Sequence, residues 1–218
     1  MTSAIDRIYL WACECLYNEF AWSYDAVSWL VSGGRWQSWR ELVLDELPPG
    51  RVLELGFGTG ELLLALAAQG RTVYGLEQSR AMQRIARRKL QTRGLSAQVR
   101  RFQGIAQRLP FADGSFAAVV ATFPAGYIFD AIAAGEIARV LQPPEAGASA
   151  GRLVVGGVAI TLDNPRLARA MPVFYGEPAA PALARWQATL VEAGLRPRLI
   201  SRPAGGVHVL MLVAEKAA

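Results

Sequence analysis

The chain has 218 residues, of which 52% are hydrophobic, and a formal net charge of +5. This length and apolar content are typical of one globular domain and exclude a disordered chain. No run of about 18 apolar residues lacks charges, glycine and proline, so no transmembrane helix is expected. The first residues show no basic-then-apolar signal pattern, and the expected location is therefore the cytoplasm.

Cysteine and histidine are too scarce to build a metal centre. Cys13 and Cys15 are the two cysteines, and His208 is the single histidine. Two cysteines at this spacing on a helix point to different faces and do not bridge easily. Tetrahedral zinc needs four ligands, mostly Cys or His. The sequence therefore predicts neither a disulfide framework nor a metal site.

The first 48 residues are predicted to form a helical cap. Apolar spacing predicts helices over 4–20, 24–31 and 36–47, the last ending at Pro48-Pro49-Gly50. Five of the six tryptophans lie within the first 40 residues. Packing of these helices on a sheet would account for them. The functional alternative is an aromatic lid over an apolar substrate.

From residue 51 onward, strand-like and helical runs alternate, which predicts an α/β fold with a mostly parallel sheet and helices on both faces. The last two strand-like runs are too close for a helix between them, so the final strand is expected to be antiparallel. One domain is expected over 1–218, with the cap at 1–48, a cofactor-binding core at 49–160 and a substrate-side segment with closing strands at 161–218. The predicted strands are 51–55, 72–76, 97–102, 116–122, 151–160, 195–202 and 206–215, and the predicted helices are 60–69, 79–93, 130–141 and 181–194.

A glycine turn between the first strand and its helix is the most informative local pattern. Gly56, Gly58 and Gly60 are spaced Gly-x-Gly-x-Gly, which lets a ligand approach the backbone closely. Glu77 follows Gly60 by seventeen residues and ends the next predicted strand. A carboxylate there can bind the hydroxyls of a ribose. Together these features predict an adenosine-containing cofactor.

Two observations favour S-adenosylmethionine over NAD. A dinucleotide site requires the spacing Gly-x-Gly-x-x-Gly, which is not met here. Glu61 stands at the helix start, where its carboxylate would repel a pyrophosphate. S-adenosylmethionine carries a positive sulfonium and ammonium and no phosphate. An NAD-dependent oxidoreductase is kept as a disfavoured alternative.

The ordered motifs of residues 50–160 resemble those of class I S-adenosylmethionine-dependent methyltransferases, of the ubiquinone/menaquinone C-methylase type (methyltransferase type 11). The resemblance implies a Rossmann-like seven-stranded sheet and an enzyme that methylates a small molecule and releases S-adenosylhomocysteine. The matching segments are 52–60, 77–82, 102–116, 136–143 and 151–154, with Tyr24-Asp25 upstream.

The resemblance also implies roles for individual residues. The three glycines would lie against the methionine part, Glu54 would hold the ammonium, and Glu77 would accept both ribose hydroxyls. Structural alternatives stay open, since Glu77 could only cap a helix and Tyr24 or Met82 could only pack. The further implied cofactor contacts are Tyr24, Phe57, Gln78, Met82, Ile105, Ala106, Thr122 and Phe123.

One position departs from the family pattern. Family members commonly have Gly-Asp-Ala after the third strand, where the acid bonds the adenine amino group. This chain has Gly104-Ile105-Ala106, and an isoleucine side chain cannot accept that bond. Weaker adenine discrimination, or another acceptor such as Gln107, is therefore expected.

Methyl transfer by direct displacement needs an acceptor held in line more than an elaborate catalytic group. Tyr127 and His208 are the candidate bases, and a structural role stays open for each. The tryptophan-rich cap and the aromatic run at 123–129 predict a small apolar or aromatic acceptor, with 161–181 shaping its pocket. A non-catalytic S-adenosylmethionine-binding module and an RNA-directed methyltransferase are the alternatives.

Residues 78–112 contain nine basic residues and no acidic one. Arg80, Arg84, Arg87 and Arg88 fall on one face of the predicted helix. A solvated face is the simplest interpretation, and the sharper ones are contact with an anionic membrane through residues 80–101 or with RNA. No aromatic residue interleaves with the arginines of this helix, which disfavours nucleic acid. A monomer or homodimer is expected.

Overall fold

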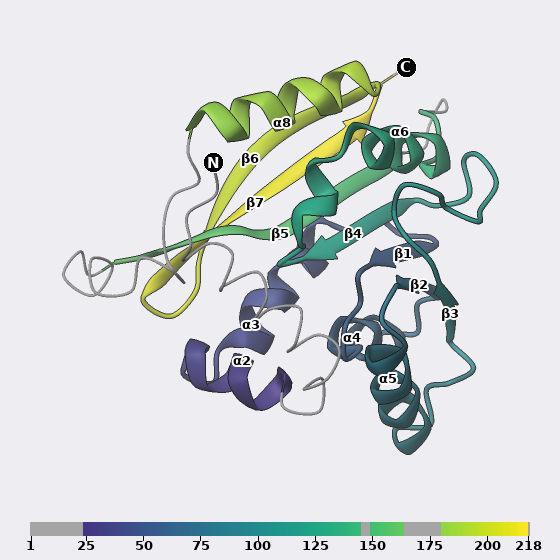
Figure 1. The fold of residues 1–218 in the computed structure, drawn as a ribbon, viewed down its shortest axis with the longest axis vertical. Helices are drawn as coiled ribbons and strands as arrows, with labels where there is room; N and C mark the ends of the chain where they lie inside the picture. Colours follow the sequence, from purple (N-terminus) through teal and green to yellow (C-terminus); the bar gives the residue numbers. More distant parts are fainter. Residues whose placement is uncertain (1–23, 145–148, 164–179, 218) are drawn as a thin grey trace.

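The computed structural model describes residues 24–144, 149–163 and 180–217, which form a sheet with helices on both sides (Figure 1). Seven strands make up the described sheet, in the order β3-β2-β1-β4-β5-β7-β6. The strands are β1 (Val52–Leu55), β2 (Val73–Glu77), β3 (Val99–Gln103), β4 (Ala118–Thr122), β5 (Arg152–Leu162), β6 (Leu195–Pro203) and β7 (Val207–Lys216). The helices are α2 (Tyr24–Ser32), α3 (Trp36–Glu41), α4 (Glu61–Ala68), α5 (Arg80–Thr92), α6 (Ala131–Val140) and α8 (Ala180–Glu192), with short 3-10 helices η2 (Leu42–Glu46) and η3 (Gly126–Phe129).

Strands β1 to β5 pair in parallel, and β7 runs antiparallel between β5 and β6. The turn from β6 to β7 spans residues 204–206, which is too short for a crossover helix. This confirms the predicted hairpin and the predicted mostly parallel sheet with an antiparallel last strand.

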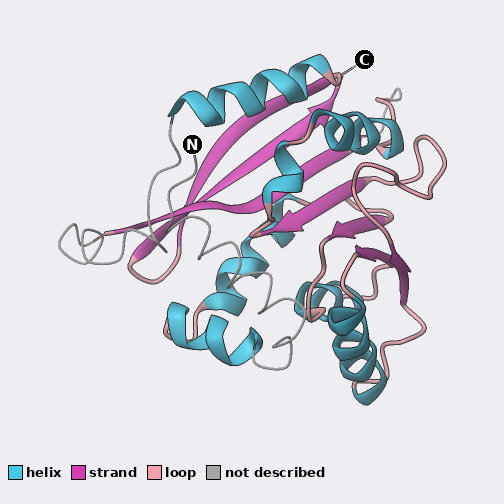
Figure 2. Cartoon of the chain, in the orientation of Figure 1, coloured by secondary structure: helices cyan, strands magenta, loops and turns pink. Residues whose placement is uncertain are grey.

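Helices cover both faces of the sheet (Figure 2). Residues of α3, η2, α4 and α5 share one buried cluster, and residues of α6 and α8 share the other. Along β1, Val52 belongs to the first cluster and Leu53 to the second, and in β5 Val154 and Leu153 divide in the same way. Because neither face meets water, the central strands are mostly apolar, and Glu54 is the charged residue within β1. Among the described helices, none is long and apolar enough to cross a membrane.

The structure differs from the sequence prediction at residues 36–47. In place of one α-helix, α3 stops at Glu41 and continues as the 3-10 helix η2. Leu47 then adopts an extended backbone, because the following Pro48 disfavours helical geometry in the residue before it. The predicted helix at 4–20 lies outside the described residues.

The strand predicted over 116–122 is also shorter than expected. Strand β4 begins at Ala118, and Phe116 makes an isolated bridge with Leu141. The short helix η3, which follows β4, was not predicted. The carboxyl ends of β1, β2 and β4 lie side by side, so the turns that follow them meet at one edge of the sheet.

Candidate functional site

The glycine turn after β1 is built from left-handed backbone. Gly56, Gly58 and Gly60 have φ of +67°, +53° and +85°, a region that disfavours side chains. A Cβ on Gly60 would approach the Cβ of Ala86 to 2.8 Å, whereas a Cβ on Gly58 would meet nothing within 4 Å. The turn is therefore tight beneath Gly60 and open beside Gly58.

Glu77, at the end of β2, stabilises this turn by hydrogen bonding. Its Oε2 accepts a hydrogen bond from Gly58 N at 2.9 Å, and its Oε1 accepts one from Ser79 N at 2.7 Å. The side chain is buried. A carboxylate has about four lone-pair sites, so each oxygen keeps acceptor capacity. Glu77 thus supports the turn and the start of α5, and the ribose role stays a prediction that the geometry permits.

Glu54 is the unusual group of the site. It lies within β1 with 2% of its surface exposed, and its Oε2 has no hydrogen-bond partner. Burial raises the pKa of Glu54 to about 8, the charge of Arg40 opposes this rise, and the charge of Glu77 adds to it. A buried acceptor without a donor is costly. The site therefore presents an acceptor that a bound cation could satisfy.

Tyr127, a candidate base, lies over the glycine turn. Its hydroxyl donates to the carbonyl oxygen of Leu55 at 3.0 Å and would be 2.7 Å from a Cβ on Gly56. Burial, and then the charges of Glu77 and Glu54, raise the pKa of Tyr127 above its ordinary value. The phenol therefore keeps its proton near neutral pH and acts here as a donor.

His208, the other candidate base, is not brought to the glycine turn. It pairs with Thr161 on β5, five residues beyond Gly156, which is level with the end of β4. A β-bulge between Val155 and Ala159 interrupts this stretch, so at about 3.3 Å per residue the separation along the strand is at most roughly 16 Å. The exposed ring lies 3.5 Å from Asp163 Oδ1 and 3.4 Å from Ser201 Oγ, so its contacts belong to the far end of the β5–β7 pair.

The remaining predicted contacts lie around the same edge in different environments. Phe57 is buried, and its ring occupies the place a side chain on Gly75 would need. Met82 and Ala106 are also buried, while Gln78 and Ile105 are exposed. The side chain of Tyr24 lies outside what the structure describes.

Phe123, which directly follows β4, has a strained backbone conformation. Its φ is +48°, which is uncommon for a bulky residue and is typical of functional sites. Its ring stacks on Trp36 with centroids 4.1 Å apart. A Cβ on Gly157 would come within 2.2 Å of the Phe123 ring, so that glycine makes room for the stack. The sequence indicated Phe123 and a tryptophan-rich cap but not this pairing.

A polar link between α2 and the glycine turn was missed by sequence reasoning. Asp25 accepts a hydrogen bond from Thr59 Oγ1 at 2.7 Å and pairs with Lys89 Nζ at 2.5 Å. Lys89 also pairs with Glu61 at 2.5 Å. This pairing offsets the charge of Glu61 and so weakens the argument that Glu61 excludes a phosphate. The motif Tyr24-Asp25 was the available signal.

The hollows on the surface of the protein do not by themselves show where the candidate site lies. One hollow lies at the amino ends of the strands, beside Gly50 and Arg71, and another lies between Phe129 and Trp186. Neither includes the glycine turn. The unpaired Glu54 and the open space beside Gly58 identify the site better than surface shape does.

Comparison with known proteins agrees with this geometry. Residues 52–144 match the family described as methyltransferase domain. The chain is 40% identical over 146 residues to the demethylmenaquinone methyltransferase of Thermus thermophilus, covering 64% of this chain and 63% of that relative. Residues 52–144 therefore match a methyltransferase domain. The chain spans less than two thirds of that relative's length.

Solved structures show the same fold at low identity. The YcgJ protein of Bacillus subtilis has a TM-score of 0.61 and 19% identity, covering 83% of this chain and 99% of that one. Geranyl diphosphate C-methyltransferase of Streptomyces coelicolor, solved with S-adenosyl-L-homocysteine, has a TM-score of 0.58 and 15% identity, covering 83% and 77%. These similarities show that the chain shares the fold of these proteins.

Proposed function

We propose that this protein transfers a methyl group from S-adenosylmethionine to a small, aromatic, quinol-like acceptor by direct displacement. The observation that carries the proposal is Glu54, a buried carboxyl whose Oε2 has no partner at the glycine turn. The ammonium of S-adenosylmethionine is the donor that such a group lacks. When bound, this cofactor supplies a methyl group on a positively charged sulfonium.

The residues of the turn fit that cofactor. Gly58 would let its amino-acid part lie on the backbone, and Glu54 would ionise on meeting the ammonium. Glu77 would accept the ribose hydroxyls through the lone pairs that Gly58 N and Ser79 N leave free. Tyr127 would hold the turn through Leu55 rather than remove a proton, because its raised pKa keeps it protonated.

The acceptor class rests on two lines of support. The Thermus relative is named demethylmenaquinone methyltransferase, which describes a quinone-type acceptor. Independently, the Trp36–Phe123 stack offers an aromatic surface beside the end of β4. Stacked aromatic faces bind flat aromatic ligands well. In this proposal packing against this aromatic surface orients the acceptor.

The test is calorimetric titration of S-adenosylmethionine, S-adenosylhomocysteine and NADH into the wild type, Glu77→Ala and the matched control Glu192→Ala. Glu192 is exposed at the end of α8. We expect both sulfur compounds to bind the wild type and the control. Two charge-assisted hydrogen bonds are worth about 1.5–3 kcal/mol each, so Glu77→Ala should lose at least about 100-fold in affinity. Binding of NADH alone would overturn the proposal.

Turnover is tested separately with methyl-labelled S-adenosylmethionine and 1,4-naphthalenediol as a minimal aromatic acceptor. Label recovered in the naphthalene product supports the acceptor class. Binding of the cofactor without transfer to this or any substituted quinol would leave a cofactor-binding module, the alternative that the absent adenine acid at Ile105 favours.

A further inference from the structure

Arg40, near the end of helix α3, carries a buried guanidinium without a partner. Only 8% of the residue is exposed. Within the described part of the chain, its side chain forms no ion pair and donates no hydrogen bond. Burying a charge is costly unless the charge is paired. Arg139 and Arg152, by contrast, both pair with carboxylates.

The guanidinium of Arg40 is nevertheless within reach of a ligand. Among the described side chains, the nitrogens that are both fully enclosed and without a partner belong to Trp36 and Arg152, and none belongs to Arg40. Its unpaired nitrogens therefore border a space that solvent can enter. An anion that entered this space would satisfy them.

The position of Arg40 on α3 places it at the carboxyl edge of the sheet. Trp36, one turn earlier, stacks on Phe123 directly after β4, and Figure 1 shows α3 beside the tip of that strand. Val43, one turn later, lies against Gly156 of β5, where an added Cβ would come within 2.5 Å of Val43 Cγ1. Gly156 is level with the last residue of β4. Residues 36, 40 and 43 follow one side of the helix, so Arg40 lies on the side that meets the ends of β4 and β5.

Arg40 and Glu54 are close to each other but do not bond. The charge of Arg40 acts on Glu54 more strongly than the charge of Glu77 does. No ion pair joins Arg40 and Glu54 in the described structure. Glu54 Oε2 lacks a donor, and the guanidinium of Arg40 lacks an acceptor. Two buried groups of opposite charge are thus each incomplete beside the same glycine turn.

We infer that Arg40 binds the carboxylate of an α-amino acid group whose ammonium is bound by Glu54. Such a group carries a positive and a negative charge on one carbon atom, so it needs an acid and a base that lie near each other without pairing. A guanidinium is suited to the carboxylate because it can donate two parallel hydrogen bonds. The inference rests on the proposed function, in which the amino-acid group is that of S-adenosylmethionine.

Lys89, which reaches the glycine turn through Asp25, is already occupied. It pairs with Asp25 and with Glu61 at 2.5 Å each, and Asp25 accepts from Thr59 in the turn. A ligand carboxylate would have to displace one of these partners to use Lys89. Arg40 needs no such displacement.

The experiment is calorimetric titration of the full chain with S-adenosylhomocysteine and with decarboxylated S-adenosylhomocysteine, which keeps the ammonium and lacks the carboxylate. Arg40→Met removes the charge and keeps an unbranched apolar stem. We expect this variant to bind S-adenosylhomocysteine about 10- to 100-fold more weakly, as for a lost hydrogen bond to a charged group. It should bind the decarboxylated ligand with a loss of less than about threefold, because no contact to that ligand is removed. The matched control Arg185→Met, at an exposed arginine of α8, should leave both affinities within the same limit.

Thermal unfolding without ligand separates a binding role from a structural one. Because a buried charge without a partner destabilises a fold, Arg40→Met should unfold at the wild-type temperature or above it. S-adenosylhomocysteine should raise the midpoint of the wild type more than that of the variant. A lowered midpoint of the free variant, with the same affinity loss for both ligands, would mean that Arg40 supports the fold and would overturn the inference.

The two ligands also distinguish this inference from the proposed function. Equal losses with both ligands at an unchanged midpoint would overturn the inference, because Arg40 would then act through the charge of Glu54. Unchanged binding of S-adenosylhomocysteine by Arg40→Met would overturn it as well and leave the cofactor proposal standing. A wild type that binds neither ligand would instead remove the proposed function, and the inference with it.

Discussion

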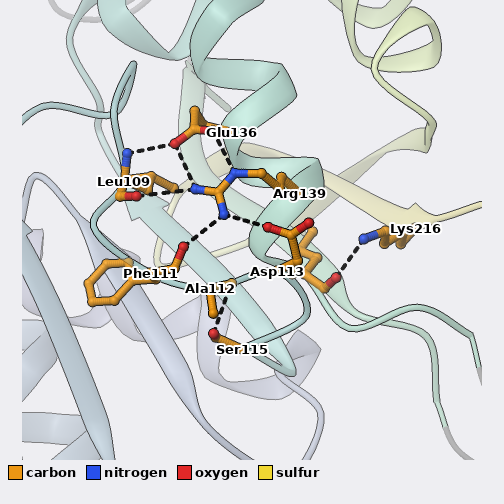
Figure 3. Close-up of polar contacts among 9 residues, drawn as sticks. Leu109, Phe111, Ala112, Asp113, Ser115, Glu136, Arg139 and Lys216 are labelled. Atoms are coloured by element: carbon orange, nitrogen blue, oxygen red, sulfur yellow. Dashed lines mark hydrogen bonds and ion pairs between the residues drawn. The ribbon is translucent and has the colours of Figure 1, made fainter.

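Two charged clusters of this protein differ in whether their hydrogen bonds are complete. At the glycine turn, Glu54 is buried with one oxygen unpaired. On the other side of the sheet, Arg139 of α6 is fully engaged (Figure 3). Its guanidinium donates to both oxygens of Glu136, to Asp113 and to the carbonyl oxygens of Leu109 and Phe111.

The pKa values of the two carboxyl groups shift in opposite directions. The guanidinium of Arg139 holds the pKa of Glu136 below its usual range, whereas burial raises that of Glu54. A satisfied ion pair stabilises a loop and keeps its charge at neutral pH. An unsatisfied carboxyl keeps a proton until a cation arrives. Glu54 is thus both more deeply buried than Glu136 and incompletely hydrogen-bonded, and these two properties together separate the candidate binding group from the structural one.

The largest expected effect is the pH dependence that Glu54 confers on stability. Its pKa is about 8 in the folded protein and 4.5 when unperturbed. Between these values the folded chain holds a proton that the unfolded chain has released. The free energy of unfolding should therefore fall as pH rises from about 4.5 to 8. One pKa unit corresponds to about 1.4 kcal/mol, so the loss is of the order of a few kcal/mol.

Urea unfolding at several pH values between 5 and 8.5 measures this effect. The variant Glu54→Gln cannot ionise and should lack the decline, so the difference between the two curves isolates Glu54 from all other titrating groups. Parallel curves would show that Glu54 is solvated in the folded protein, and the contrast with Glu136 would disappear.

The second prediction breaks the satisfied cluster. Arg139→Leu removes the donors that hold Leu109 and Phe111 and leaves Glu136 without a cation, although it still accepts from Leu109 N. We expect a loss of about 2–3 kcal/mol in the free energy of unfolding. S-adenosylhomocysteine affinity should change by less than about threefold, and Arg185→Leu, an exposed control on α8, should be within about 0.5 kcal/mol of wild type. A large affinity loss without destabilisation would make Arg139 part of the site.

The third prediction sharpens the role of the unpaired carboxyl. Glu54→Gln should weaken S-adenosylhomocysteine binding by about 10- to 100-fold, since a hydrogen bond to a charged group is worth about 1.5–3 kcal/mol. Because an ammonium would ionise Glu54, wild-type binding near pH 7 should release a proton. Titrations in two buffers of different ionisation enthalpy measure that release. Proton release that persists in Glu54→Gln would assign it to another group.

The sequence predicted the parts of this protein that are encoded locally. Strands covered on both faces are continuous apolar runs, and left-handed turns need glycine, so both are visible as short patterns. The link between Asp25 and Lys89 joins residues 64 positions apart, and Trp36 stacks on Phe123, a residue distant in sequence whose φ is positive. No local period encodes such contacts. Residues 42–46 form a 3-10 helix. To predict it, the effect of Pro48 would have had to be set against a strong α-helical pattern.

The smallest expected effect concerns Ile105, where this chain departs from the methyltransferase pattern that it resembles. Ile105 is 45% exposed just after β3, and Gln107, the substitute acceptor, already donates to Asp130 at 3.4 Å. Ile105→Asp should restore an acceptor for the adenine amino group and tighten S-adenosylhomocysteine binding by about 2- to 10-fold, as expected for one added hydrogen bond. The exposed Ile132 on α6 supplies the control Ile132→Asp.

S-inosylhomocysteine, which carries an oxygen in place of that amino group, makes the test of Ile105→Asp specific. The gain should appear with the adenosyl compound and vanish with the inosyl compound, because a carboxylate facing a carbonyl oxygen has no donor to bond. Equal gains with both ligands would mean that the aspartate acts through its charge alone. The adenine ring would then lie away from residue 105. Glu54 would remain the group of this site that lacks a hydrogen-bond partner.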